Sequence, residues 1–128
     1  MAERKPLVLV VDDAGLVRRY YRRILEAAGF AVEEALNGLE ALEKLLAAPP
    51  MLVIVDVNMP QMDGLTFLAA LRRQPLPFSS VPALVVTTEA GPQDSAAARA
   101  AGANYYLVKP LSERVLLDYA AALSGVPL

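Results

Sequence analysis

Two short, wholly apolar runs that each end in aspartate constrain the fold of this chain more than any other feature. Leu7–Val11 (LVLVV) is followed by Asp12 and Asp13, and Met51–Val55 (MLVIV) is followed by Asp56. Apolar runs of about five residues are typical of strands that are buried on both faces of a parallel sheet. If these two strands are neighbours, their carboxylates meet at one edge of the sheet and repel one another. A hard divalent cation with oxygen ligands relieves this repulsion, so the pattern predicts a Mg2+-dependent phosphate site.

Short apolar runs and helical patterns alternate along the rest of the chain. Strands are predicted over residues 7–11, 31–35, 51–55, 83–86 and 104–108, and helices over 14–28, 38–48, 64–74, 92–101 and from 112 onward. This alternation predicts an α/β fold, a doubly wound five-stranded parallel sheet with five helices. Right-handed crossovers make the first and third strands neighbours, and ligands of such sheets bind beyond the carboxyl ends of the strands at this switch point. The acidic residues follow those two strands.

Local signals indicate the environment of each element. Glu33 and Glu34 within the second strand favour an edge position, and the wholly apolar third strand is expected at the centre. Gly29 is expected to end the first helix, and Ser112 to cap the last. The expected buried faces are Leu16, Tyr20, Ile24 and Ala28 in the first helix, Leu39, Leu42 and Leu46 in the second, and Val115, Leu116, Tyr119 and Leu123 in the last.

The composition excludes several classes of site. The chain of 128 residues contains no cysteine and no histidine, which excludes disulfides, thiolate nucleophiles, Ser-His-Asp triads and zinc sites with Cys or His ligands. A net charge of -2 provides no broad basic surface for nucleic acid. No apolar stretch reaches the length of about 20 residues that a membrane helix needs, and the charged N-terminus does not resemble a signal peptide. A single domain over residues 1–128 and a cytoplasmic location are therefore predicted.

Further motifs follow the predicted strands in order. The segment from Asp56 to Gly64 reads D-x-x-M-P-x-M-D-G, Thr87 ends the fourth strand, and Lys109 followed by Pro110 ends the fifth. Together with the paired aspartates after the first strand, these motifs resemble the receiver domain of two-component response regulators. The resemblance covers essentially the whole chain. It implies a flavodoxin-like fold with strand order 2-1-3-4-5 and a cis peptide bond between Lys109 and Pro110.

The resemblance also implies a role for each acidic residue. Asp56 is expected to be the phosphoacceptor, whose carboxylate becomes an acyl phosphate. Asp13 and Asp56 are expected to ligate Mg2+ directly, Asp12 through a water molecule, and Asn58 through its backbone carbonyl. Lys109 would supply positive charge to the phosphoryl oxygens.

A conformational switch is a further implication of the resemblance. Thr87 is expected to donate its hydroxyl to the phosphoryl group and to move toward it, while Tyr106 rotates inward into the space that is vacated. In the family, the positions of Asn58 and Glu89 flank the site and tune dephosphorylation. This pair is most similar to that of single-domain chemotaxis regulators.

The predicted function is that of a stand-alone receiver rather than an enzyme. It would accept a phosphoryl group from a histidine kinase or phosphotransfer protein in a Mg2+-dependent reaction, and hydrolyse it slowly. The modification would switch the binding of an output protein in chemotaxis-type or related two-component signalling. The donor histidine must belong to another protein, because this chain has none. Neither direct nucleic-acid binding nor membrane insertion is expected.

Three other functions stay open at this point. A Mg2+-dependent phosphohydrolase with an aspartyl nucleophile usually carries a second acid two residues later, where this chain has Asn58. A flavin-binding module needs a Gly-, Ser- or Thr-rich phosphate loop after the first strand, where two aspartates stand here. A receiver fragment of a larger DNA-binding regulator is disfavoured by the end at SGVPL, which lacks a basic linker.

Some assignments are ambiguous in the sequence. Thr88 adjoins Thr87, and alternation places Tyr105 and Tyr106 on opposite faces of one strand, where only one can be the switch. The first helix carries arginines at positions 18, 19, 22 and 23. This basic stretch either docks a kinase or phosphotransfer domain, or forms a solvated face with ion pairs four residues apart.

Overall fold

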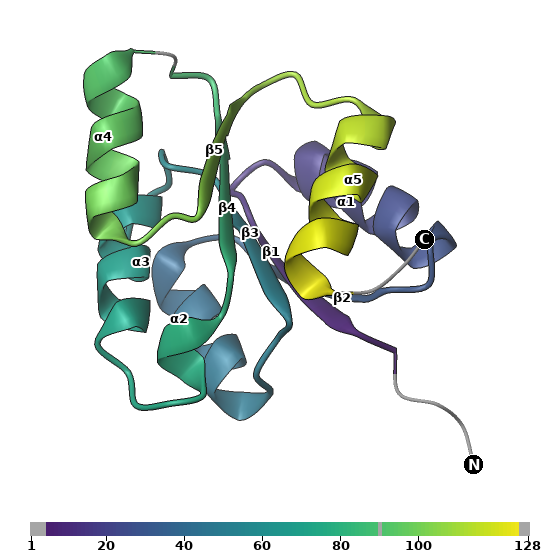
Figure 1. The fold of residues 1–128 in the computed structure, drawn as a ribbon, viewed down its shortest axis with the longest axis horizontal. Helices are drawn as coiled ribbons and strands as arrows, with labels where there is room; N and C mark the ends of the chain where they lie inside the picture. Colours follow the sequence, from purple (N-terminus) through teal and green to yellow (C-terminus); the bar gives the residue numbers. More distant parts are fainter. Residues whose placement is uncertain (1–4, 90, 126–128) are drawn as a thin grey trace.

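The computed structural model describes residues 5–89 and 91–125, and its elements alternate as the sequence predicts (Figure 1). The strands are β1 (Leu7–Val11), β2 (Ala31–Ala35), β3 (Leu52–Val55), β4 (Ala83–Thr87) and β5 (Tyr105–Val108). The α-helices are α1 (Gly15–Ala27), α2 (Gly38–Ala47), α3 (Gly64–Arg72), α4 (Pro92–Ala101) and α5 (Glu113–Ser124). A short 3-10 helix, η1 (Phe78–Ser80), lies in the proline-rich segment between α3 and β4.

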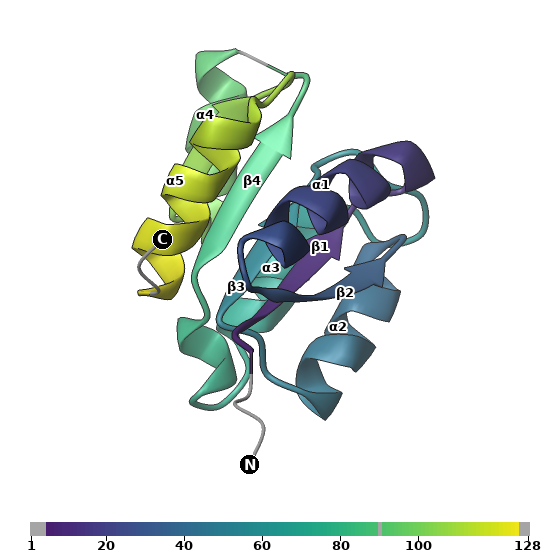
Figure 2. The same cartoon turned by 90° about the vertical axis from the view of Figure 1, so that its right-hand side faces the viewer.

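The strands form a parallel sheet in the order β2-β1-β3-β4-β5, which confirms the predicted topology. β2 lies at an edge and β3 at the centre, as expected. Helices α1 and α5 cover one face, and α2, α3 and α4 cover the other (Figures 1 and 2). Strand residues alternate between the two hydrophobic cores, so that Val10 packs toward α1 and α5 while Val11 packs toward the other three helices. Within residues 5–89 and 91–125, no helix has the length and apolarity to cross a membrane.

The predicted buried face of α1 is wrong at its first residue. Leu16 is 77% exposed, whereas Tyr21, Ile24 and Leu25 are buried. A helix has 3.6 residues per turn, so residues spaced by four drift around it and leave the packed face within two turns. Tyr21, Ile24 and Leu25 are spaced by three and four residues, and this spacing keeps them on the side of α1 that faces the sheet. Tyr20 is only partly buried beside them.

The predicted face of α2 is wrong at two of its three leucines, since only Leu42 packs, partly buried, against the core. Leu39 and Leu46 are exposed, whereas Ala41 and Leu45 are fully buried in the core that α2 shares with α3 and α4. A close-packed interior accepts a small side chain where the helix approaches the sheet, and the larger leucines then lie beside the contact. In α5 the expected Leu116 is buried, and Val115, Tyr119 and Leu123 pack partly buried against the core.

The ends of the elements differ from the prediction by one or two residues. β3 starts at Leu52, and β5 starts directly after Asn104, whose side chain instead accepts a hydrogen bond from the Ala83 amide at 2.7 Å. The predicted end signals are confirmed. Gly29 follows α1 with a positive φ of 100°, and the Ser112 hydroxyl accepts a hydrogen bond from the first turn of α5.

Candidate functional site

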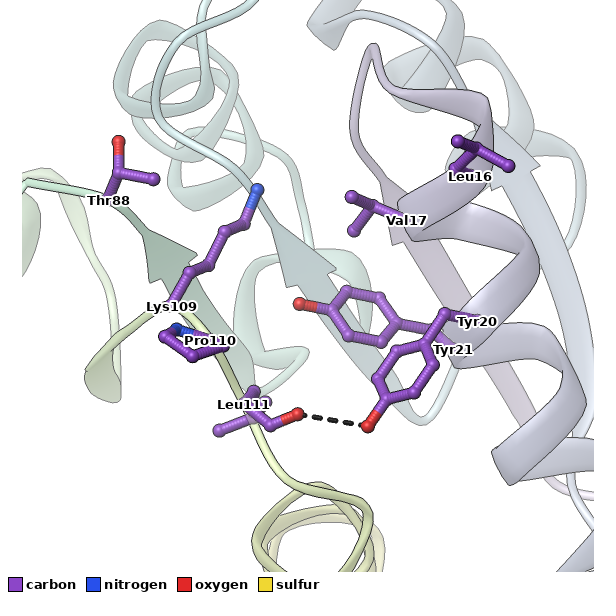
Figure 3. Close-up of a pocket in the computed structure, with 8 residues that line it drawn as sticks. All are labelled: Leu16, Val17, Tyr20, Tyr21, Thr88, Lys109, Pro110 and Leu111. Carbon is purple, nitrogen blue, oxygen red and sulfur yellow. Dashed lines mark hydrogen bonds between the residues drawn. The ribbon is translucent and has the colours of Figure 1, made fainter.

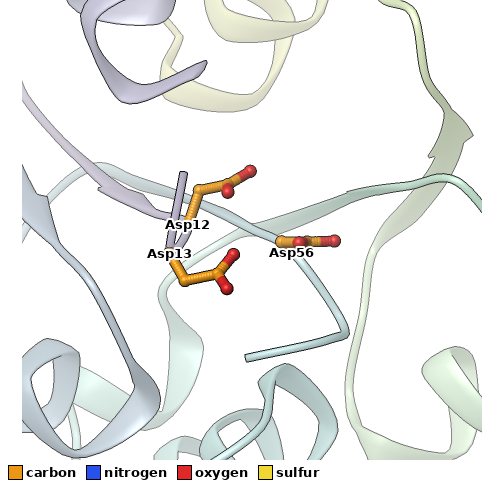
Figure 4. Close-up of side chains that lie close together, drawn as sticks. All are labelled: Asp12, Asp13 and Asp56. Atoms are coloured by element: carbon orange, nitrogen blue, oxygen red, sulfur yellow. The ribbon is translucent and has the colours of Figure 1, made fainter. Parts of the chain in front are cut away.

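Parallel pairing brings the carboxyl ends of β1 and β3 together. Val11 and Val55 are register partners, and the amide of Asp56 donates to the Val11 carbonyl at 2.9 Å. Asp12, Asp13 and Asp56 therefore leave the sheet at the same edge, and one carboxylate oxygen of each lies within 4.8 Å of the others (Figure 4). Asp12 is buried, whereas Asp13 is open to solvent. The predicted meeting of the three carboxylates is thus observed.

A lysine from the end of β5 joins the three acids. Lys109 Nζ lies 2.8 Å from Asp12 Oδ2 and 3.6 Å from Asp56 Oδ2. Asp12 Oδ1 also accepts a hydrogen bond from the Ala14 amide at 2.9 Å. Because both oxygens of Asp12 are engaged, this residue is better suited to hold a metal through bound water than by direct contact. The peptide bond between Lys109 and Pro110 is cis, as the resemblance implies.

The environment of Asp56 favours its uncharged form. Burial raises the pKa of Asp56 above its ordinary value of 3.8, and the negative charges of Asp12 and Asp13 raise it further. The ammonium of Lys109 acts in the opposite direction but does not reverse the shift. Burial, together with the charges of Asp12 and Asp56, also raises the pKa of the nearby Tyr21 hydroxyl. Negative charge at this edge is therefore incompletely compensated by the protein, and a divalent cation would complete the compensation.

Asp56→Asn is expected to stabilise the metal-free protein at neutral pH. Because folding raises the pKa of Asp56, the folded protein holds this proton more tightly than the unfolded chain does. The stability of the wild type therefore falls as the pH rises from 3.8 through the folded-state pKa. At pH 7 in EDTA, thermal unfolding followed by circular dichroism should show a midpoint about 3 °C higher for the variant.

A change of pH and a control variant test whether charge at Asp56 causes this difference in midpoint. The difference in midpoint should disappear well below pH 3.8, where the Asp56 carboxyl is protonated in both the folded and the unfolded wild type. Asp118→Asn removes the same charge at an exposed position of α5 and should leave the midpoint at pH 7 within 1 °C of the wild type. An Asp56→Asn variant that melts below the wild type at pH 7 would contradict the electrostatic explanation.

The loop between β3 and α3 is shaped by the glycine of its motif. A Cβ atom at Gly64 would lie 2.1 Å from the carbonyl oxygen of Asp56, so a side chain there displaces the backbone beneath the site. The Gly64 amide donates to the Val57 carbonyl at 2.9 Å, and Asp63 caps α3 by accepting a hydrogen bond from the Thr66 amide at 2.8 Å. The D-G that ends the motif is therefore explained by backbone geometry.

The structure distinguishes the two adjacent threonines. Thr87 is fully buried at the end of β4, and its hydroxyl oxygen accepts a hydrogen bond from the Glu89 amide at 3.4 Å. Thr88 is exposed and lines a cavity beside the acids. Since β4 neighbours β3, Thr87 ends next to the strand that carries Asp56. Its role as a donor to a phosphoryl group stays a prediction.

Glu89 connects the residues that the resemblance assigns to the switch and to dephosphorylation. Its carboxylate accepts a hydrogen bond from Asn58 Nδ2 at 2.6 Å, and its backbone carbonyl accepts one from the Tyr106 hydroxyl. Tyr106 is partly buried against the core beneath α2, α3 and α4, whereas Tyr105 is exposed and packs edge-on against Tyr119. The two adjacent tyrosines thus lie on opposite faces, as alternation predicts. The sequence does not reveal the link through Glu89, because its partners come from separate segments.

Two arginines of the basic stretch in α1 are used inside the molecule. Arg18 and Arg22 bind Glu34 of β2 at 2.9 and 2.6 Å, and Arg18 also donates to the Asp12 carbonyl at 2.6 Å. These bonds attach α1 to the edge strand and hold the backbone of the site, a role of Arg18 and Arg22 that the sequence does not predict. Arg22 also pairs with Glu26 at 3.1 Å, four residues along the helix. Docking of a kinase by this stretch stays a prediction.

Comparison with known proteins agrees with this fold and this site. Residues 8–121 match the response regulator receiver domain family. The chain belongs to this family. The cluster of three aspartates at the carboxyl ends of β1 and β3 fits the Mg2+ binding that receiver domains show.

Relatives of this receiver domain are similar over most of their length. It is 38% identical to chemotaxis protein CheY1 of Helicobacter pylori over 120 residues, which are 92% of this chain and 96% of the relative. Protein PilG of Pseudomonas aeruginosa is 34% identical over 110 residues, which are 86% of this chain and 81% of the relative. Among solved structures, chemotaxis protein CheY4 of Vibrio cholerae has a TM-score of 0.86 and 38% identity, over 93% of this chain and 98% of that one.

Family membership narrows the possible functions. A receiver domain is a phosphoacceptor switch, a signalling module rather than a catalyst acting on other substrates, and the family match does not favour the phosphohydrolase. The strand order of this chain is that of flavodoxin-like folds, and the structure of chemotaxis protein CheY4 shares its fold. The extent of the domain over residues 1–128 and the cytoplasmic location stay predictions.

Proposed function

We propose that this receiver domain accepts a phosphoryl group on Asp56 from a histidine kinase or phosphotransfer protein, and thereby switches binding to an output protein in chemotaxis-type signalling. One observation carries the proposal: the carboxylates of Asp12, Asp13 and Asp56 lie within 4.8 Å of one another, with Lys109 beside two of them. Similarity to chemotaxis protein CheY1 supports the signalling context. The phosphohistidine must lie outside these 128 residues, because they contain no histidine.

The residues at this edge of the sheet fit a magnesium ion. Mg2+ prefers oxygen ligands and is usually bound by one or two carboxylates together with phosphate oxygens. Asp13 and Asp56 would ligate it directly, Asp12 through water, and Asn58 through its backbone carbonyl. When bound, the ion neutralises the carboxylates, so that an anionic phosphoryl group can approach Asp56.

Asp56 supplies the nucleophile of the transfer. One carboxylate oxygen attacks phosphorus, the bond from phosphorus to the donor nitrogen breaks, and imidazole leaves with the bonding electrons. Lys109 would pair with the phosphoryl oxygens, and its contact with Asp12 at 2.8 Å keeps the ammonium beside Asp56. The Thr87 hydroxyl would donate to the same group. Phosphoryl transfer depends on positioning and charge stabilisation, so the lack of a histidine base is no obstacle.

The switch would use the hydrogen bond between Tyr106 and Glu89. Movement of Thr87 toward a phosphoryl group displaces the backbone that leads to Glu89, whose carbonyl holds the Tyr106 hydroxyl. Tyr106 would then rotate inward, and the surface formed by α4, β5 and α5 would change for the output protein. Phosphorylation shifts this equilibrium through contacts that differ between the two states. Asn58 and Glu89 would set the rate of slow hydrolysis.

Intact mass spectrometry after incubation with acetyl phosphate and Mg2+ tests this function. The wild type is expected to gain one phosphoryl group, whereas Asp56→Asn gains none because an amide is not a nucleophile for phosphorus. Chelation with EDTA should prevent the gain, and Asp118→Asn on the exposed side of α5 should behave as the wild type. A phosphoryl group of equal yield on the Asp56→Asn variant would overturn the assignment.

A further inference from the structure

An apolar cavity of about 490 Å3 opens beside the acidic cluster, between α1 and the segment that follows β5 (Figure 3). The Tyr20 hydroxyl donates to the Leu111 carbonyl at 3.1 Å, which holds the two sides of the cavity together. Leu16, Tyr20 and Tyr21 line it from α1, and Lys109, Pro110 and Leu111 line it from the other side.

Lys109 belongs to both the cavity and the acidic cluster. Its side chain lines the cavity, while its ammonium reaches Asp12 at 2.8 Å and Asp56 at 3.6 Å. A donor whose phosphoryl group meets this ammonium would place its leaving group at the mouth of the cavity if it leaves on the side of Lys109. The contact with phosphate is electrostatic, whereas the walls beyond Lys109 offer mainly aliphatic and aromatic carbon.

We propose that this cavity binds the leaving group of a small-molecule phosphoryl donor and selects acyl phosphates that carry an aromatic ring over acetyl phosphate. This inference rests on the proposed phosphorylation of Asp56. In the reaction a carboxylate oxygen of Asp56 bonds to phosphorus. The bond from phosphorus to the oxygen that bridges it to the acyl carbon breaks, and the aromatic carboxylate leaves with the electron pair.

The size and chemistry of the cavity support an aromatic ring. Cavities of roughly 300–1,000 Å3 hold organic ligands larger than acetate, whose single methyl group covers little of the wall. The partly buried ring of Tyr20 offers its free surface to a third ring. The buried ring of Tyr21 supports it, at 53° to it and with centroids 5.8 Å apart. Leu16 is 77% exposed at this site, so a ring packed on it removes apolar surface of both groups from water.

The test compares benzoyl phosphate with acetyl phosphate, because both release a carboxylate and differ mainly in the attached group. Second-order rate constants are measured from time courses of intact mass at fixed Mg2+. The wild type is expected to react about tenfold faster with benzoyl phosphate, which corresponds to partial burial of one ring. Leu16→Ala should react about fivefold more slowly with benzoyl phosphate, and within twofold of the wild type with acetyl phosphate.

Leu46→Ala is the matched control, because Leu46 is also an exposed leucine but lies on α2, across the sheet from α1. It should keep the full preference for benzoyl phosphate. Equal rates of the wild type with both donors would overturn the inference, and so would an unchanged preference in Leu16→Ala. These outcomes leave Asp56 phosphorylated. Failure of the proposed function looks different, because then neither donor adds a phosphoryl group, or Asp56→Asn gains one as readily as the wild type.

Discussion

Asp13→Asn is expected to weaken Mg2+ binding about hundredfold, at the upper end of the losses seen when residues that merely support metal ligands are replaced. The variant removes one of three carboxylates whose oxygens lie within 4.8 Å of one another. Asp13 is the informative choice because it is exposed, whereas Asp12 is buried and bonded to Lys109 and to the Ala14 amide. A change at Asp13 therefore removes a ligand with little effect on the fold.

Titration with Mg2+, followed through the rise in the midpoint of thermal unfolding, measures this loss. An ion that binds the folded state raises its stability with the logarithm of the ion concentration, once this concentration exceeds the dissociation constant. The variant should therefore need about a hundredfold more Mg2+ to reach the same rise in the unfolding midpoint. Asp118→Asn makes the same chemical change on the exposed side of α5 and should follow the wild-type curve. Identical curves for Asp13→Asn and the wild type would show that Asp13 is not a ligand.

Arg72→Ala is expected to lower the free energy of unfolding by about 3 kcal/mol, a large share of the stability of a small domain. Arg72 donates to the Gly102 carbonyl at 2.7 and 3.0 Å, to the carbonyls of Ser79 and Val81 at 2.9 and 2.7 Å, and to Asn104 Oδ1 at 3.1 Å. It thereby joins the end of α3 to η1, to the end of α4 and to the start of β5. Burial lowers the pKa of Arg72, and the variant would leave its carbonyl partners without this donor.

Denaturant unfolding followed by circular dichroism tests the role of Arg72, with the slope of the transition compared between variants. Arg73→Ala is the matched control, since Arg73 is the next residue and is exposed; its change should stay within about 0.5 kcal/mol. Arg72→Lys should recover only part of the loss, because an ammonium cannot reproduce the planar fork that reaches three segments. A loss below about 1 kcal/mol for Arg72→Ala would contradict this role.

The sequence predicts the sheet and the acidic edge because both depend on short-range patterns. Five apolar runs separated by helical patterns define the order of the elements, and right-handed crossovers leave few ways to arrange them. Asp12, Asp13 and Asp56 follow two of these runs directly, so their meeting depends only on β1 and β3 being neighbours. Lys109 is located by the same reasoning, at the end of β5.

The sequence does not predict features that depend on the direction of a side chain or on contacts with backbone groups far away in the chain. Leu16 lies in a row of apolar residues spaced by four, yet it points to solvent because the packed face of α1 follows the spacing of three and four. Arg72 binds mostly carbonyl groups, which every residue has, so no sequence pattern marks its partners. Glu89 accepts hydrogen bonds from residues 31 positions before it and 17 positions after it, and this proximity exists only in the folded chain.

A crystal structure with Mn2+ in place of Mg2+ tests most directly whether the three carboxylates bind one divalent ion, because the anomalous signal of Mn2+ locates the ion. One ion is expected at the carboxyl ends of β1 and β3, in direct contact with carboxylate oxygens of Asp13 and Asp56 and with the backbone carbonyl of Asn58. Its contact with Asp12 is expected to pass through a water molecule. A structure at saturating Mn2+ with no ion at this edge, or with the ion bound elsewhere, would contradict the proposed site.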